Sequence, residues 1–236
     1  MLRSTSLLAT PPLSRAHAQH GASLIIVMLI LIVVSILGVG GAQIALMAER
    51  GARNDRDMQL AWQSAEAALI DAEIDLTTPT APITVPPSPS KARGDIFGMT
   101  TVGTAGMKRN VQSSALPIDN SLFPLECGLA NSRNAGLCGL PVVGSTDKPA
   151  WLAVDFTEED VTKARSAAFG QFTGRTFEAG SVGVQPAQVP RYTIELIPDP
   201  GRDKTKPADN YVYRVTAMGF GPREDIQAVL QMLYRN

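Results

Sequence analysis

An uncharged run from Ala22 to Ala48 constrains this chain more than any other feature of its sequence. The run has 27 residues, of which 21 are hydrophobic, and only two serines, one glutamine and three glycines interrupt it. About 20 consecutive apolar residues are enough for a helix to cross the hydrocarbon core of a bilayer. A secretory signal peptide has a shorter apolar core and a small-residue cleavage site after it, and no such site follows here. The run therefore predicts a transmembrane helix.

The helical pattern continues beyond the run. Apolar or small residues recur there at spacings of 4, 3, 4, 3 and 4, namely at Met58, Trp62, Ala65, Leu69, Ala72 and Leu76. This is the period of an amphipathic helix, and we expect these residues to be its packing face. Pro79 comes just past the stripe, where a helix stops. One helix over residues 22–77 would be roughly 80 Å long, with a transmembrane part at about 22–48.

Composition and motifs argue against several classes of function. The net charge is −1 and the pI about 6.1, which argues against a basic nucleic-acid surface. The two histidines, His17 and His20, both precede the uncharged run. The chain has no phosphate-binding glycine loop, no HExxH motif and no nucleophile elbow. We therefore predict a protein that is not an enzyme, has no cofactor and binds no nucleic acid.

Two segments adjoin the run. The first is a polar leader, residues 1–21, which ends in Gly21 directly before the apolar helix. The second has the pattern ER-x3-N-x2-D-x3-A-x-Q-x-AEAAL-x2-AE. It comprises Glu49, Arg50, Asn54, Asp57, Ala61, Gln63, Ala65, Glu66, Ala67, Ala68, Leu69, Ala72 and Glu73. Together, the two segments resemble the PilX family of type IV pilus minor pilins. The resemblance implies that prepilin peptidase cuts between Gly21 and Ala22 and that the new N-terminus is methylated.

This resemblance covers about the first third of the chain and implies its location and partners. Counted by Lys and Arg alone, the flanks of the helix slightly favour a cytoplasmic downstream side. The resemblance implies the reverse, with an inner-membrane helix and a periplasmic head that reaches the cell surface in the pilus. The implied partners are other minor pilins, the major pilin, prepilin peptidase and the inner-membrane assembly machinery.

The fifth residue after the implied cleavage site is Ile26. Major pilins carry a glutamate there, which the resemblance implies pairs with the N-terminal ammonium of the neighbour assembled just before. Type II secretion pseudopilins of the GspK kind also lack this glutamate and lie at the filament tip. We hypothesise a tip position for this chain, and the alternative is that Ile26 is merely a tolerated apolar residue.

Gly38, Gly40 and Gly41 indicate either a helix that loosens in the filament or ordinary close packing of membrane helices.

Residues 78–90 contain five prolines and predict an extended linker before a head at residues 91–236. Cys127 and Cys138 predict a disulfide in a periplasmic domain, although two buried free thiols remain an alternative. No histidine lies near them to support a metal site.

The rest of the head gives local patterns. Acidic residues after Thr157 predict a short capped helix at about 158–169. Residues 191–197, 211–218 and 226–234 predict an antiparallel meander that can pack on the long helix, although the last segment also fits a helix. The loop between the first two strands is a weak calcium candidate, through Asp199, Asp203 and Asp209.

These features predict an α+β, pilin-like fold: a long N-terminal helix packed on an antiparallel sheet. The predicted function is a minor pilin that helps to initiate pilus assembly and supports pilus display, adhesion and twitching motility. A GspK-like pseudopilin of type II secretion is the nearest alternative. A membrane-anchored periplasmic enzyme or adhesin is the alternative from a different class.

Overall fold

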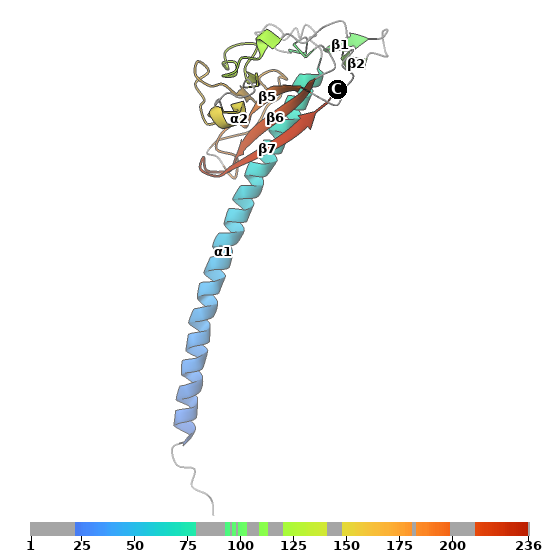
Figure 1. The fold of residues 1–236 in the computed structure, drawn as a ribbon. Helices are drawn as coiled ribbons and strands as arrows, with labels where there is room; N and C mark the ends of the chain where they lie inside the picture. Colours follow the sequence, from blue (N-terminus) through green and yellow to red (C-terminus); the bar gives the residue numbers. More distant parts are fainter. Residues whose placement is uncertain are drawn as a thin grey trace, which may run out of the picture. The chain divides into compact units, whose positions relative to one another are not determined.

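The fold is described from a computed structural model (Figure 1). It describes residues 22–78, 93–94, 96–97, 99–102, 109–112, 120–140, 148–180, 183–198 and 211–235. The chain forms two compact units, residues 1–52 and 53–236. The leader, the calcium candidates Asp199, Asp203 and Asp209, and nearly all of the linker lie outside the described residues.

Helix α1 spans Ala22–Thr77 without interruption, which confirms the predicted long helix. No proline lies within it to remove a backbone donor or to clash with the preceding turn. Near its C-terminus, the Thr77 hydroxyl donates a hydrogen bond to the Glu73 carbonyl at 2.8 Å. In the first unit, α1 is the only element that the described residues form.

The second unit is built on a five-stranded sheet with the order β3-β5-β6-β7 and with β4 also paired to β5. The strands are β3 Leu137–Cys138, β4 Ala167–Ala168, β5 Arg191–Pro198, β6 Tyr211–Phe220 and β7 Gln227–Tyr234. β5, β6 and β7 form an antiparallel meander, and only β3 pairs in parallel. The predicted meander is therefore confirmed, and its last segment is a strand rather than a helix (Figure 1).

The core lies between the Arg53–Thr77 part of α1 and one face of this sheet. Small residues of α1 let the sheet approach closely, and Ala61, Ala65, Ala68 and Ala72 are all fully buried. On the facing strand, a side chain at Gly219 would collide with the backbone of α1, at the Ala65 nitrogen and the Ala61 oxygen. A glycine is therefore required where β6 crosses the helix.

The buried face of α1 differs from the predicted stripe at its N-terminal end. Ala65, Ala72 and Leu76 are fully buried, as a packing face requires. Met58 and Trp62 instead keep 39% and 49% of their surface exposed. The face that meets the sheet is rotated toward smaller residues, because the sheet approaches too closely for bulky side chains. Asp71 and Asp75, which lie off the predicted stripe, are buried at its far end.

The predicted helix at 158–169 is wrong. Asp160 accepts hydrogen bonds from the backbone N–H and the hydroxyl of Thr162 at 2.9 and 2.7 Å, which holds a turn. Such local side-chain bonds compete with helical hydrogen bonds. The segment then enters β4, and the short helix in this region is α2, Ala150–Ala153.

The remaining elements are short. β1 (Met99–Val102) and β2 (Arg109–Gln112) pair in an antiparallel two-stranded sheet of their own. A single 3-10 turn, η1, covers Asn120–Leu122. Between the strands and helices, the described head is mostly turns and loops.

Candidate functional site

The first candidate surface is the apolar part of α1. Its large side chains are solvent-exposed throughout, from Leu24 at 69% to Met47 at 72%. This is the one helix among the described residues that is long and apolar enough to cross a membrane, and its apolar window is 0% buried. Apolar surface of this extent is unstable in water, so it requires lipid or other protein helices around it.

A buried charge cluster joins α1 to the head. Arg93 and Asp75 form a salt bridge at 2.6 Å, and the side chains of both are fully buried. Arg93 also donates to the Ala135 carbonyl at 2.6 Å and stacks over Phe172 with its guanidinium carbon 3.7 Å from the ring centroid. The Tyr192 hydroxyl on β5 donates to Asp75 at 2.9 Å, and burial, followed by the Asp75 charge, raises the pKa of Tyr192. The cluster therefore joins four other segments of the chain to one turn of α1.

One helical turn earlier, Asp71 makes a second polar connection. Its carboxylate accepts hydrogen bonds from the Gly170 N–H at 2.7 Å and from the Thr173 hydroxyl at 2.5 Å. Arg175 lies 3.6 Å away. Burial raises the pKa of Asp71, and these three partners only partly offset that effect. Like the Arg93 cluster, the arrangement fixes a head loop on the helix.

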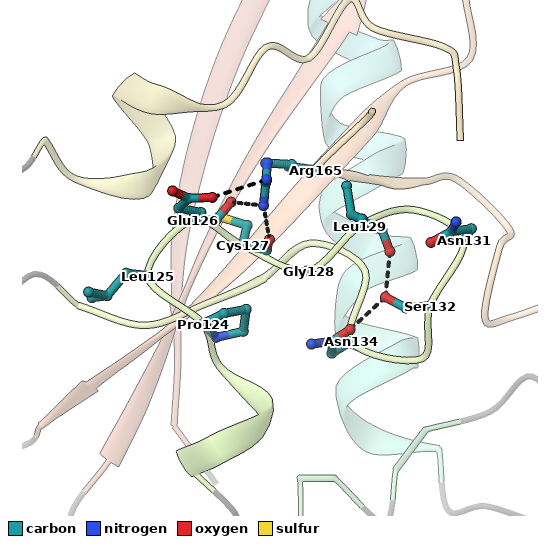
Figure 2. Close-up of a pocket in the computed structure, with 10 residues that line it drawn as sticks. All are labelled: Pro124, Leu125, Glu126, Cys127, Gly128, Leu129, Asn131, Ser132, Asn134 and Arg165. Carbon is teal, nitrogen blue, oxygen red and sulfur yellow. Dashed lines mark hydrogen bonds and ion pairs between the residues drawn. The ribbon is translucent and has the colours of Figure 1, made fainter. Parts of the chain in front are cut away.

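The third candidate lies around the disulfide loop (Figure 2). The Cys127–Cys138 disulfide is present, which confirms that prediction, and both cysteines are buried. Arg165, just before β4, holds the loop in place. It donates a hydrogen bond to the Cys127 carbonyl at 2.9 Å and forms an ion pair with Glu126 at 3.0 Å. An open groove of about 490 Å³ runs along the loop, with residues from Pro124 to Asn134 and Arg165 as its walls.

No metal centre or catalytic arrangement is evident in the part of the chain that the structure describes. There, no group of three or more His, Cys, Asp or Glu side chains is placed to hold a metal ion. The buried carboxylates are used in hydrogen bonds and ion pairs that hold the head on α1 or pair neighbouring strands, as Glu195 does with Arg214 at 2.6 Å.

The sequence-predicted residues lie mainly along α1. Ile26 is 59% exposed, and a side chain added at Gly38, Gly40 or Gly41 would meet nothing within 4 Å. Most of the polar family-motif residues lie on exposed positions of the helix, namely Glu49, Arg50, Asn54, Gln63, Glu66 and Glu73. Asp57 is half-buried and pairs with Arg56 at 2.8 Å. These residues do not converge on one point.

A long helix, apolar in its first half and packed on an antiparallel sheet in its second, defines a pilin-like α+β architecture. Residues 20–69 match the model of the PilX N-terminal family. Residues 126–236 match the model described as type IV pilus assembly protein PilX C-term. The chain therefore belongs to the PilX-like minor pilins of type IV pili. No curated protein and no solved structure matches the chain.

Sequence reasoning missed the charge cluster. Asp71 and Asp75 are four residues apart and therefore share one side of a helix, and Asp75 stacks beside Ala72 and Ala68 on that side. Acids among alanines were the available signal for a buried polar contact. Arg93 gave none, because it follows the proline-rich linker with no periodic pattern around it.

Proposed function

We propose that this minor pilin takes part in starting type IV pilus assembly and lies at or near the filament tip. It would be processed after Gly21, wait in the inner membrane, and then pass with other pilins into the filament. Pilus display, adhesion and twitching motility would depend on it. The observation that carries the proposal is Ile26, an exposed apolar residue at the fifth position after the implied cleavage site.

The physical argument starts from the cost of an intramembrane carboxylate. A glutamate at this depth is several kcal/mol unfavourable, at about the level of translocon-based scales, unless it is paired. Major pilins recover that energy by pairing with a neighbour's ammonium group, as the family resemblance implies. With isoleucine, the chain has no such requirement, so its helix enters the filament without an earlier partner. That property suits the first subunit.

The exposed side of α1 in the second unit supports a subunit role. Met58 and Trp62 are 39% and 49% exposed although both are large and apolar. They are four residues apart and therefore lie on one side of the helix. We propose that this side packs against a neighbouring pilin helix. That contact would bury the apolar surface of Met58 and Trp62 that the head leaves exposed.

The test compares a deletion strain with strains that carry Gly21→Lys and Ile26→Glu. Surface pili and twitching should fall in the deletion and in Gly21→Lys, and immunogold labelling of the wild type should mark filament ends. Ile26→Glu should lower assembly, because its carboxylate has no partner at the tip. Even labelling along the shaft would contradict the tip position, and normal pili in the deletion would remove the assembly role. A deletion that blocks secretion of exoproteins and leaves pili intact would favour the pseudopilin alternative.

An anchored enzyme or adhesin predicts a different result. Its function should survive replacement of residues 22–52 by an unrelated transmembrane helix. A pilin with the same replacement should remain folded in the membrane but be excluded from filaments, because neighbour choice among apolar helices depends on packing rather than on hydrophobic gain.

A further inference from the structure

β7 (Gln227–Tyr234) is the last strand of the main sheet, and within the described residues only β6 pairs with it (Figure 1). The hydrogen-bond pattern shows which of its backbone groups point outward. Gly221 donates its N–H to the Ile226 carbonyl at 2.8 Å, and these two residues are directly opposite in the register that β6 and β7 continue. In an antiparallel pair, hydrogen-bonded positions recur at every second residue.

The residues of β7 that bond to β6 are therefore Ala228, Leu230, Met232 and Tyr234. The backbone N–H and C=O groups of the alternate residues point away from β6, and these residues are Gln227, Val229, Gln231 and Leu233. The hydrogen bonds of β5, on the other side of β6, agree with this assignment of inward and outward residues. Ile194 on β5 donates its N–H to Gly136, away from β6, as an even-numbered residue of β5 must do in this register.

Within the described residues, this edge has none of the usual protection. Sheet edges are normally blocked by charged side chains, prolines or bulges, which prevent pairing with other chains. β7 contains no charged residue, no proline and no glycine, and its register with β6 runs without a bulge over eight pairs. Two large apolar side chains stand beside the free backbone groups, with Val229 at 49% and Leu233 at 69% exposure.

We propose that the free edge of β7 accepts an extended strand from a different protein of the pilus assembly, so that the sheet continues from one chain into the other. Unpaired N–H and C=O groups in a row match only another polypeptide strand. The incoming strand needs apolar side chains opposite Val229 and Leu233 and a polar one opposite Gln231. The proposal deepens the assembly role proposed above and rests on it.

A second copy of this chain fits the edge less well. Antiparallel pairing of β7 with β7 would reverse the Arg53–Thr77 part of α1 in one copy. Parallel pairing would put the two helices on opposite faces of the joined sheet. Neither arrangement lets helices of the two copies run side by side, as helices packed together in one filament do. A strand from a different subunit has no such restriction.

Hydrogen exchange of the backbone tests the proposal. The full chain in detergent is compared with the same chain in the assembly complex purified after co-expression of the pilus proteins. In the free chain, the amides of Gln227, Val229, Gln231 and Leu233 should exchange rapidly, and those bonded to β6 slowly. In the complex, these outward amides should slow at least tenfold. Unchanged exchange of the outward amides would overturn the proposal.

Val229→Pro removes one outward N–H and leaves the ladder to β6 intact, which edge strands tolerate. Val229→Thr keeps that N–H and is the matched control. Both variants should retain the wild-type unfolding midpoint in detergent, and surface pili should fall at least tenfold in Val229→Pro alone. Normal pili with folded Val229→Pro would overturn the strand proposal while leaving the assembly role intact, which only the deletion strain tests. A covalent homodimer of Gln231→Cys in the purified chain would overturn the choice of occupant.

Discussion

Replacing Arg93 should destabilise the head more than replacing any other buried arginine. The reason is that Arg93 neutralises a carboxylate that has no contact with water. The Arg93 and Asp75 side chains are both 0% exposed and lie 2.6 Å apart. Arg93→Met keeps the apolar stem but leaves Asp75 with only the Tyr192 hydroxyl. Removing one partner of a buried pair costs about 3–5 kcal/mol. The freed Ala135 carbonyl is part of the same cost.

The double variant Arg93→Met with Asp75→Leu separates charge from packing. Both ions are then absent. The remaining loss of unfolding free energy comes from the unpaired Ala135 carbonyl and Tyr192 hydroxyl, at about 1–3 kcal/mol for each group. The double variant should therefore be more stable than the sum of the two single changes predicts, by at least about 2 kcal/mol.

The assay is denaturant unfolding of the full chain in detergent micelles, with the disulfide intact and tryptophan fluorescence as the signal. Arg223→Met is the matched control, because Arg223 pairs with Asp225 at a site where both side chains are about 70% exposed. The control should not differ measurably from the wild type. If Arg93→Met also left the unfolding free energy unchanged, or if the two single changes simply added, the pair would not stabilise the head as described.

Three further predictions concern other contacts. Gly219→Ala should cost about 1–3 kcal/mol in the same assay, since its new carbon meets the α1 backbone, whereas Gly51→Ala should stabilise α1 by about 1 kcal/mol. Reduction of Cys127–Cys138, which closes a loop of sequence separation 11, should lower the unfolding free energy by about 3 kcal/mol, and Cys127→Ser with Cys138→Ser should make the protein insensitive to dithiothreitol. Burial raises the pKa of Asp71 above 3.8, so its contribution is fully present below that value and is lost as pH rises through the folded pKa. The stability of the wild type relative to Asp71→Asn should therefore increase on acidification from pH 7 toward 4, and a decrease would contradict this assignment.

The long helix and the C-terminal meander were predictable because both depend on patterns local in sequence. The uncharged run and the 4-3-4 spacing indicate α1. The alternating residues of β7 favour a strand, although the same segment also fits a helix. The rotation of the buried face away from Met58 and Trp62 was not predictable, because it depends on how closely Gly219 lets β6 approach the helix.

The failed helix prediction at 158–169 has a similar cause. The sequence after Thr157 contains good capping residues, but Asp155 and Asp160 each close a local turn, on Thr157 and on Thr162. Two short bonds of this kind outweigh a helix with no partner surface to bury. The disulfide was predictable from two cysteines in a domain with an implied periplasmic location. The hydrogen bond from Arg165 to its loop was not, because it joins residues 38 positions apart.

The polar contacts of α1 also set the order in which the chain gains its structure. The partners of Asp71 and Asp75 lie far along the sequence, at separations of 99 for Gly170 and 117 for Tyr192. Contacts that close such long loops form late, because the chain loses much entropy before they form. During synthesis, the helix emerges from the ribosome long before Tyr192 is made. Until then, the two aspartates remain in water. Their charges therefore keep the alanine-rich face of the helix soluble before the sheet has formed and covered it.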